Sequence, residues 1–264
     1  QAEDVSSRIE SVKYRVEEAS KAAGRSQIPR LVAVSKLHPP SSILAAYIHA
    51  KQTHFGENYV QEMVDKAKVL PRDIRWHFVG GMQSNKGKML ASVPNLYLLE
   101  TLDSIKAANV LEKALASPDA IERDEPLRVY LQVNTSGEDV KSGLPPLTQE
   151  AGGTEDGEGH SLLELAKHVV ISCPNLVFSG LMTIGSAANS SARAAATNRD
   201  EALRANPDFA KLHESRRHGG LELSMGMTAD FPVAIAAGSD NVRIGTDCFG
   251  VRPSTREEAK KAME

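Results

Sequence analysis

The chain begins with apolar side chains spaced three and four residues apart, which is the period of a helix with one buried face. This spacing predicts a helix over residues 4–23, and Gly24 is typical of the residue that follows a helix C-terminus. The apolar positions of this stripe are Val5, Ile9, Val12, Val16 and Ala19.

Eight short apolar runs follow this helix, and helix-sized intervals separate them. Runs that are apolar at nearly every position are typical of parallel strands covered on both faces. The eight runs are residues 30–36, 53–57, 75–80, 96–100, 127–134, 176–182, 221–227 and 241–246.

This alternation predicts the α/β class, with residues 1–264 forming a single-domain (β/α)8 TIM barrel that carries an extra N-terminal helix. A doubly wound open sheet is the structural alternative, but it gives no reason for the strand count to stop at eight.

Two segments interrupt the pattern. Residues 145–160 are rich in glycine and acidic side chains, and residues 186–198 are rich in serine and alanine. Both are expected to be flexible insertions on the surface. The second follows the sixth predicted strand, where a barrel loop can act as a lid over the active site. A tolerated loop expansion is the simpler interpretation of each.

Charge and cysteine content narrow the function classes. A net charge of -3 lacks the basic surplus of a nucleic-acid-binding protein, and no apolar run is long enough to cross a membrane. Two cysteines are too few for a disulfide framework or a Cys-rich zinc site, so no metal site is predicted and a reducing, cytoplasmic location is expected. The chain opens on Gln1, which leaves a removed mitochondrial targeting segment open.

Lys36 is the first candidate for chemistry because it follows the first predicted strand. Alternation places Val32, Val34 and Lys36 on one side of that strand. If that side faces the barrel interior, partial desolvation lowers the pKa of the lysine and provides a neutral amine that can form a Schiff base. A solvated lysine at a strand end is the alternative.

The ends of the seventh and eighth strands supply a candidate phosphate site. Such sites in barrels are often built from the loops after these two strands. Ser224 and Gly226 close the seventh strand, and Gly245 and Thr246 close the eighth, so each end provides a hydroxyl and a glycine. A lysine nucleophile together with a phosphate site indicates pyridoxal 5'-phosphate, an aldehyde cofactor that carries a phosphate.

Six motifs in order along the chain resemble the pyridoxal phosphate homeostasis proteins, which are single barrels similar to the N-terminal domain of alanine racemase. The resemblance spans residues 31–252 and leaves out the two insertions. The motifs are LVAVSK, FGENYVQE, WHFVGGMQSNK, GLMTIG, LSMGMTAD and VRIGTDCFG.

This resemblance implies a role for each site residue. Lys36 matches the lysine that carries the cofactor as an internal aldimine, and Arg243 matches an arginine near the pyridine nitrogen. Such an arginine leaves that nitrogen unprotonated, which makes the cofactor a weaker electron sink. The positions matching phosphate-binding residues are Ser224, Gly245 and Thr246.

Three further residues are candidates for contact with the cofactor. Asn58 and His77 lie near the ends of the second and third strands, where they are expected to line the ring. For His77, a structural hydrogen bond inside the barrel is an equal alternative. Met225, with Met227, is expected to pack against the ring or the phosphate loop, although filling space in the core is the common role of methionine.

The resemblance implies a carrier that keeps the cofactor available for vitamin B6 homeostasis, with PLP-dependent apo-enzymes as recipients and no established catalytic residues. An amino-acid racemase using Lys36 as a base is the alternative, and it needs a second acid–base group. Alanine racemase takes that group, a tyrosine, from another domain, for which no room is expected after the eighth strand of this chain. Tyr59 is the nearest candidate for this second acid–base group.

A third interpretation is a barrel enzyme acting on a phosphorylated sugar, which explains Lys36 but not the six motifs. A monomer is expected.

Overall fold

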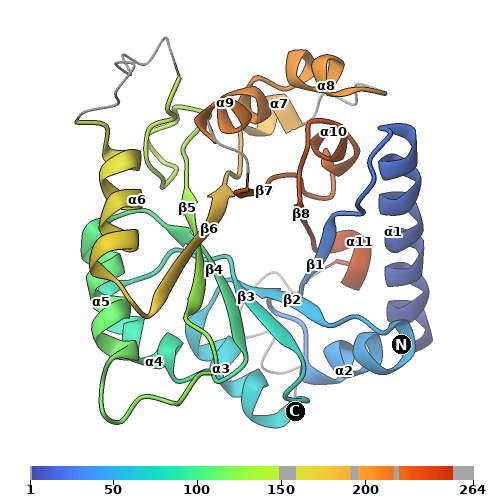
Figure 1. Ribbon diagram of the computed structural model, residues 1–264. Helices are drawn as coiled ribbons and strands as arrows, with labels where there is room; N and C mark the ends of the chain where they lie inside the picture. Colours follow the sequence, from blue (N-terminus) through green and yellow to red (C-terminus); the bar gives the residue numbers. More distant parts are fainter. Residues whose placement is uncertain (1, 149–158, 191–195, 217–219, 252–264) are drawn as a thin grey trace.

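The computed structural model describes residues 2–148, 159–190, 196–216 and 220–251, and its strands close into a parallel barrel in the order β1 to β8 (Figure 1). The expected TIM-barrel fold is therefore confirmed. The strands are β1 (Arg30–Val34), β2 (His54–Glu57), β3 (Arg75–Phe78), β4 (Leu96–Leu102), β5 (Leu127–Gln132), β6 (Leu176–Met182), β7 (Glu222–Ser224) and β8 (Asn241–Ile244).

Helices cover the outside of this barrel. The main apolar core lies between strands and helices, and a small separate cluster of Leu98, Tyr130 and Met182 lies apart from it. The helices are α1 (Ala2–Ala22), α2 (Pro40–Ala50), α3 (Val60–Val69), α4 (Gly87–Ala91), α5 (Ile105–Leu115), α6 (Ser161–Ser172), α7 (Ala187–Ser190), α8 (Arg199–Ala205), α9 (Pro207–Ser215), α10 (Phe231–Ala236) and α11 (Thr246–Phe249), with a 3-10 turn, Ser84–Lys86, before α4.

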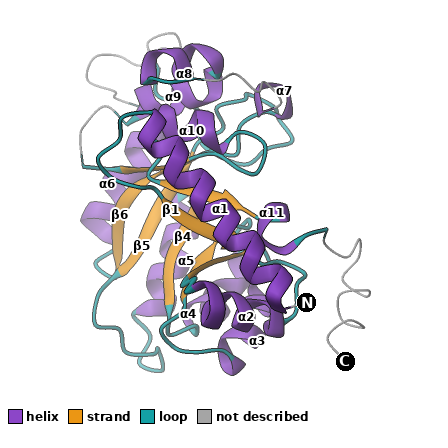
Figure 2. Cartoon of the chain, turned by 90° about the vertical axis from the view of Figure 1, so that its right-hand side faces the viewer, coloured by secondary structure: helices purple, strands orange, loops and turns teal. Residues whose placement is uncertain are grey.

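The N-terminal helix α1 is the extra helix expected from the sequence. It runs along one side of the barrel and packs on α2, α10 and α11 (Figure 2). Val5, Ile9, Val12 and Val16 are buried, as their spacing predicts. The helix ends before Gly24, which adopts a positive φ of 64°. In the part of the chain that the structure describes, no helix has the length and apolar character needed to cross a membrane.

The seventh strand is shorter than expected. Residues 221–227 form an apolar run, but β7 contains only Glu222–Ser224. The backbone leaves the sheet at Gly226, whose φ is 95°, a conformation that glycine adopts readily. A Cβ atom there would lie 2.5 Å from the Cβ of Ala234, so the turn into α10 also needs a residue without a side chain.

The two expected insertions are only partly described. Residues 149–158 and 191–195 lie outside the described residues. Within 186–198, residues Ala187–Ser190 form the short helix α7, and Asn198 caps the start of α8 by accepting from the backbone N–H of Glu201. Part of the second segment is thus helical, and the expected flexibility of both segments stays a prediction.

Adjacent glycines after β3 provide a test of close backbone packing. A Cβ on Gly80 would lie 2.0 Å from the backbone oxygen of Asn58, whereas a Cβ on Gly81 has no atom within 4 Å. We expect Gly80→Ala to reduce the free energy of unfolding by about 3 kcal/mol, because the backbone at Asn58 must move. Gly81→Ala is the matched control and should change it by less than about 0.5 kcal/mol in urea denaturation. Equal stability of the two variants would contradict this close approach of Gly80 to Asn58.

Candidate functional site

The candidate residues of three neighbouring strands lie at the carboxyl end of the barrel. β1 pairs with β8 on one side and β2 on the other, with Val32 opposite Arg243 and Val34 opposite Gly56. Beyond these pairs the chain continues into Gly245 after β8, Lys36 after β1 and Asn58 after β2. The strand order therefore brings the lysine, the amide and the glycine–threonine turn to one edge of the barrel.

The strand register shows which face Val34 takes, whereas the inward direction expected for Lys36, in the turn beyond the strand, stays a prediction. Paired residues of neighbouring strands share a face, and Val34, Gly56 and His77 form such a row across β1, β2 and β3. His77 bonds within the barrel, so this row faces the interior. Lys36 follows Val34 by two positions and is half-buried in the turn after β1.

Asn58 has a side-chain atom that its surroundings do not use. Its Oδ1 atom is buried, and among the described residues it has no hydrogen-bond partner. Buried polar atoms are nearly always paired with protein or water, so such an atom beside a strand end indicates a polar group available to a ligand.

The turn after β8 leads directly into α11. Its N-cap is Gly245, which has no side chain with which to cap the helix. Thr246, the first helical residue, is exposed. The first N–H groups of a helix have no partner within it and attract anions. Met225, in contrast, is fully buried in the main apolar core, and its expected contact with a ring stays a prediction.

Arg243 is held in the barrel interior by two acceptors. Its Nη1 donates to Ser224 Oγ at 2.5 Å, and its Nη2 donates to the backbone oxygen of Thr183 at 2.7 Å. The Glu100 carboxylate lies 3.8 Å away, so the buried guanidinium has a counter-charge. Burial lowers the pKa of Arg243, while Glu100 and Asp230 oppose this effect.

Ser224 uses its whole hydrogen-bonding capacity inside the barrel. Besides accepting from Arg243, its hydroxyl donates to Glu100 Oε2 at 2.5 Å and accepts from Asn241 Nδ2 at 3.0 Å. A hydroxyl has one hydrogen and two lone pairs, so all three are occupied. A hydrogen bond from this hydroxyl to a phosphate requires the hydrogen to leave Glu100, and this expected contact stays a prediction.

Glu100 is the centre of the network and was not a candidate from the sequence. It is fully buried and also accepts from His77 Nδ1 at 2.7 Å and from Asn241 Nδ2 at 2.8 Å. Burial opposes ionisation, but the hydrogen bond from His77, the charge of Arg243 and the bond from Ser224 outweigh it and lower the pKa of Glu100. The signal in the sequence is a carboxylate inside an otherwise apolar strand.

His77 makes hydrogen bonds within the barrel at both ring nitrogens. Its Nε2 lies 2.8 Å from His54 Nδ1, and its Nδ1 bonds to Glu100. Burial lowers the pKa of both imidazoles, so each is neutral near pH 7, with His77 donating to Glu100 and His54 donating to His77. These bonds account for both ring nitrogens of His77, and its contact with a cofactor stays a prediction.

The neutral state of His54 predicts a pH-dependent stability. Burial, together with the nearby His77, Arg30 and Arg75, lowers the pKa of His54 to about 2. Below the unfolded pKa of about 6.5, the unfolded chain binds a proton at His54 that the folded protein does not. The stability contributed by the neutral His54 is therefore fully present above pH 6.5 and is lost as pH falls, at up to about 1.4 kcal/mol per pH unit. We expect the stability difference between wild type and His54→Asn to shrink or reverse by about 1.6 kcal/mol between pH 6.5 and pH 5 in urea denaturation. A difference that does not vary with pH would contradict this assignment.

A second polar cluster contacts the backbone on both sides of Lys36, at Ser35 and Leu37. Lys66 of α3 is 2% exposed, and its Nζ lies 2.7 Å from Glu57 Oε1 and 2.7 Å from Glu62 Oε1. Burial raises the pKa of Glu57 to about 7 against the opposing charge of Lys66. In the sequence, Glu62 and Lys66 look like an ordinary i,i+4 pair on a solvated helix face, so only the fold reveals that Lys66 is buried and Glu62 partly buried.

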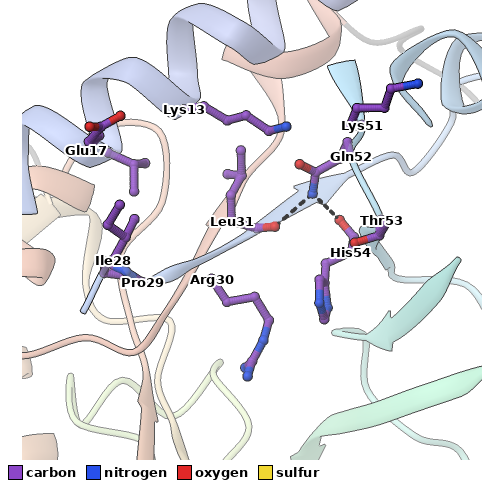
Figure 3. Close-up of a pocket in the computed structure, with 11 residues that line it drawn as sticks. Lys13, Glu17, Ile28, Pro29, Arg30, Leu31, Lys51, Gln52, Thr53 and His54 are labelled. Atoms are coloured by element: carbon purple, nitrogen blue, oxygen red, sulfur yellow. Dashed lines mark hydrogen bonds between the residues drawn. The ribbon is translucent and has the colours of Figure 1, made fainter. Parts of the chain in front are cut away.

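A cleft of about 330 Å³ lies at the opposite end of the barrel, between α1 and the beginnings of β1 and β2 (Figure 3). Gln52 lines this cleft, and its side-chain Nε2 donates to the backbone oxygens of Leu31 and His54. Two of its cationic side chains have protein partners: Lys13 bonds to the backbone oxygen of Ala50, and Arg30 pairs with Glu222. Because it lies at the amino ends of the strands, this cleft is separate from the site at Lys36.

Comparison with known proteins agrees with the motifs and with the barrel. The family model of the alanine racemase N-terminal domain matches residues 8–253. The pyridoxal phosphate homeostasis protein of Schizosaccharomyces pombe is 42% identical over 232 residues, covering 86% of this chain and 85% of that protein. The human pyridoxal phosphate homeostasis protein is 40% identical over 243 residues, covering 87% of this chain and 78% of that protein.

A solved structure extends the comparison to three dimensions. PipY of Synechococcus elongatus with PLP bound has a TM-score of 0.62 and 27% identity, and the match covers 93% of this chain and 100% of that chain. Its barrel and the family model agree with the sequence matches over nearly the whole length. The chain therefore belongs to the pyridoxal phosphate homeostasis proteins, a family built on the alanine racemase N-terminal domain.

Proposed function

We propose that this protein binds pyridoxal 5'-phosphate at the carboxyl ends of β8, β1 and β2, holds it as a Schiff base on Lys36, and serves vitamin B6 homeostasis as a carrier. The observation that carries the proposal is the position of Lys36. Lys36 is half-buried in the turn after β1, and β1 pairs with β8, the strand that bears Arg243 and is followed by Gly245.

The residues at this edge fit the chemical groups of the cofactor. Pyridoxal phosphate supplies an aldehyde, an aromatic ring and a dianionic phosphate when it is bound. Lys36 Nζ, when neutral, adds to the aldehyde carbon, and the carbonyl oxygen leaves as water. Gly245 and Thr246 provide the uncapped N-terminus of α11 for the phosphate, and Asn58 offers its unused buried amide oxygen.

Arg243 supports a carrier more than a catalyst. Its guanidinium is buried, paired with Glu100 and hydrogen-bonded to Ser224 and Thr183, so it remains charged at neutral pH. If it faces the pyridine nitrogen, as in the family resemblance, it cannot readily give that nitrogen a proton. Electron withdrawal from a substrate carbanion is then weak.

Four of the five tyrosines are poorly placed to supply a second acid–base group for racemisation. Tyr97 lies beside Arg30 and Arg128, and Tyr130 hydrogen-bonds to Glu222, all toward the amino ends of the strands. Tyr14 and Tyr47 lie on the outer helices α1 and α2, so only Tyr59 lies next to the site, directly after Asn58. We therefore favour the carrier over the racemase and infer that PLP-dependent apo-enzymes receive the cofactor.

Two measurements test this proposal together. Titration of the protein with pyridoxal 5'-phosphate should produce the visible absorbance of an imine that disappears on borohydride reduction. Incubation of the loaded protein with L-amino acids in deuterated water should give no catalytic exchange of the α-proton. A protein that binds no pyridoxal phosphate would contradict the binding site, and rapid α-proton exchange would contradict the carrier role.

A further inference from the structure

The turn that carries Lys36 has an unusual backbone and is fixed on both sides of the lysine. Leu37, the next residue, adopts a φ of 65°, which is uncommon for a residue other than glycine. Its backbone N–H donates to Glu62 Oε1 at 2.6 Å. On the other side, the backbone N–H of Ser35 donates to the oxygen of Gly56 at 2.9 Å.

Lys66 connects these two flanking residues. Its Nζ donates to the backbone oxygen of Ser35 at 2.8 Å, to Glu57 Oε1 at 2.7 Å and to Glu62 Oε1 at 2.7 Å. An ammonium group has three hydrogens, and each has an acceptor here. Ser35 Oγ also donates to Glu57 Oε1 at 2.6 Å. One buried ammonium thus joins the turn after β1 to the end of β2 and to α3.

The cluster is costly unless its geometry is kept. Lys66 is 2% exposed and Glu57 is 0% exposed, so neither charge is stabilised by bulk water. A buried ion pair adds little net stability compared with apolar residues, but loss of one partner leaves an uncompensated charge. Such groups have been found to specify a particular geometry in some proteins. Here the geometry specified is that of the backbone immediately before and after Lys36.

A second contact ties the same turn to the proposed phosphate end of the site. The His38 ring stacks on Phe249 of α11, with ring centroids 5.1 Å apart and an interplanar angle of 27°. The position of Lys36 relative to α11 is therefore held from both sides, by Lys66 toward β2 and α3 and by this stacking toward β8.

We propose that Lys66 is a positioning residue for Lys36, holding the turn through Ser35, Glu57 and Glu62 so that the Lys36 amine meets the aldehyde of a phosphate-anchored cofactor. This inference rests on the proposed function. Lys66 donates all three of its hydrogens to the protein, so it acts on the backbone and not on the ligand.

Lys66→Met tests this role because methionine fills similar space without a charge. The variant is titrated with pyridoxal 5'-phosphate and with pyridoxine 5'-phosphate, which has an alcohol in place of the aldehyde. We expect imine formation to slow, and the affinity for pyridoxal phosphate to fall, by about 10-fold to 100-fold because the amine is displaced. Affinity for pyridoxine phosphate should change less than about 2-fold, since it depends on the phosphate and ring contacts.

Lys68→Met is the matched control. Lys68 lies on the same helix, is 66% exposed and pairs with Asp65 at 3.3 Å. This variant should bind both ligands like wild type, and Lys66→Arg should recover part of the lost imine formation. An equal loss of both ligands in Lys66→Met would show a merely structural role, and unchanged imine formation would also overturn the proposal.

A second variant keeps the test decisive if Lys66→Met does not fold. Glu62→Gln preserves an acceptor for the Leu37 N–H but removes one charge from the cluster, and it should slow imine formation in the same ligand-selective way. Unchanged kinetics in this folded variant would overturn the positioning role. A wild-type protein that binds pyridoxal phosphate without a reducible imine would instead contradict the proposed role of Lys36, which separates the two failures.

Discussion

Glu100→Gln is expected to lower the free energy of unfolding by about 3–5 kcal/mol, one of the largest effects of a single substitution in this barrel. Glu100 is fully buried and compensates the charge of Arg243, whose guanidinium lies 3.8 Å away. It also accepts hydrogen bonds from His77, Ser224 and Asn241. The amide keeps the volume but removes the charge and places two donors among groups that already donate.

Urea denaturation measures this loss. Glu122→Gln is the control, since Glu122 is exposed and its replacement should change stability by less than about 0.5 kcal/mol. Combining Glu100→Gln with Arg243→Gln should cost less than the sum of the two single losses, because the double variant no longer buries an unpaired charge. A loss under about 1 kcal/mol for Glu100→Gln, or strict additivity, would contradict the central position of this carboxylate.

Lys36→Met should abolish the reducible adduct and weaken the binding of pyridoxal 5'-phosphate by at least about 100-fold, equal to about 2.7 kcal/mol. Methionine retains most of the side-chain volume but cannot form a Schiff base. Binding that remains would come from the phosphate and ring contacts. The measurement is an absorbance titration, with Lys106→Met as the control because Lys106 is exposed on α5. Wild-type imine absorbance in Lys36→Met would show that another amine carries the aldehyde.

The fold could be predicted from the sequence because its repeating unit is local. Each strand is a short apolar run, and the helix-sized intervals between runs leave a parallel barrel as the arrangement that accounts for eight of them. Lys36, Arg243 and Gly245 could be placed at strand ends for the same reason, since alternation and strand order determine position there. The end of β7 could not, because the apolar pattern continues to residue 227 although the strand ends at Ser224, just before Gly226 with its φ of 95°.

The polar clusters could not be predicted because they depend on contacts between distant segments. Glu100 and Ser224 are 124 residues apart, and their hydrogen bond exists only once β4 and β7 face the same interior. Lys66 and Glu62 are separated by one helical turn, a spacing that usually indicates a solvated pair. The burial of Lys66 and the partial burial of Glu62 follow from the way α3 packs on β2 next to the turn at Ser35.

Peptide mapping of the borohydride-reduced protein tests the central claim most directly. Wild-type protein is loaded with pyridoxal 5'-phosphate, reduced, digested and analysed by mass spectrometry. The proposed site predicts one dominant modification, a phosphopyridoxyl group on the Nζ of Lys36. Modification mainly at another lysine, or none in a folded protein supplied with excess cofactor, would contradict the assignment of this barrel as a carrier that holds its cofactor on Lys36.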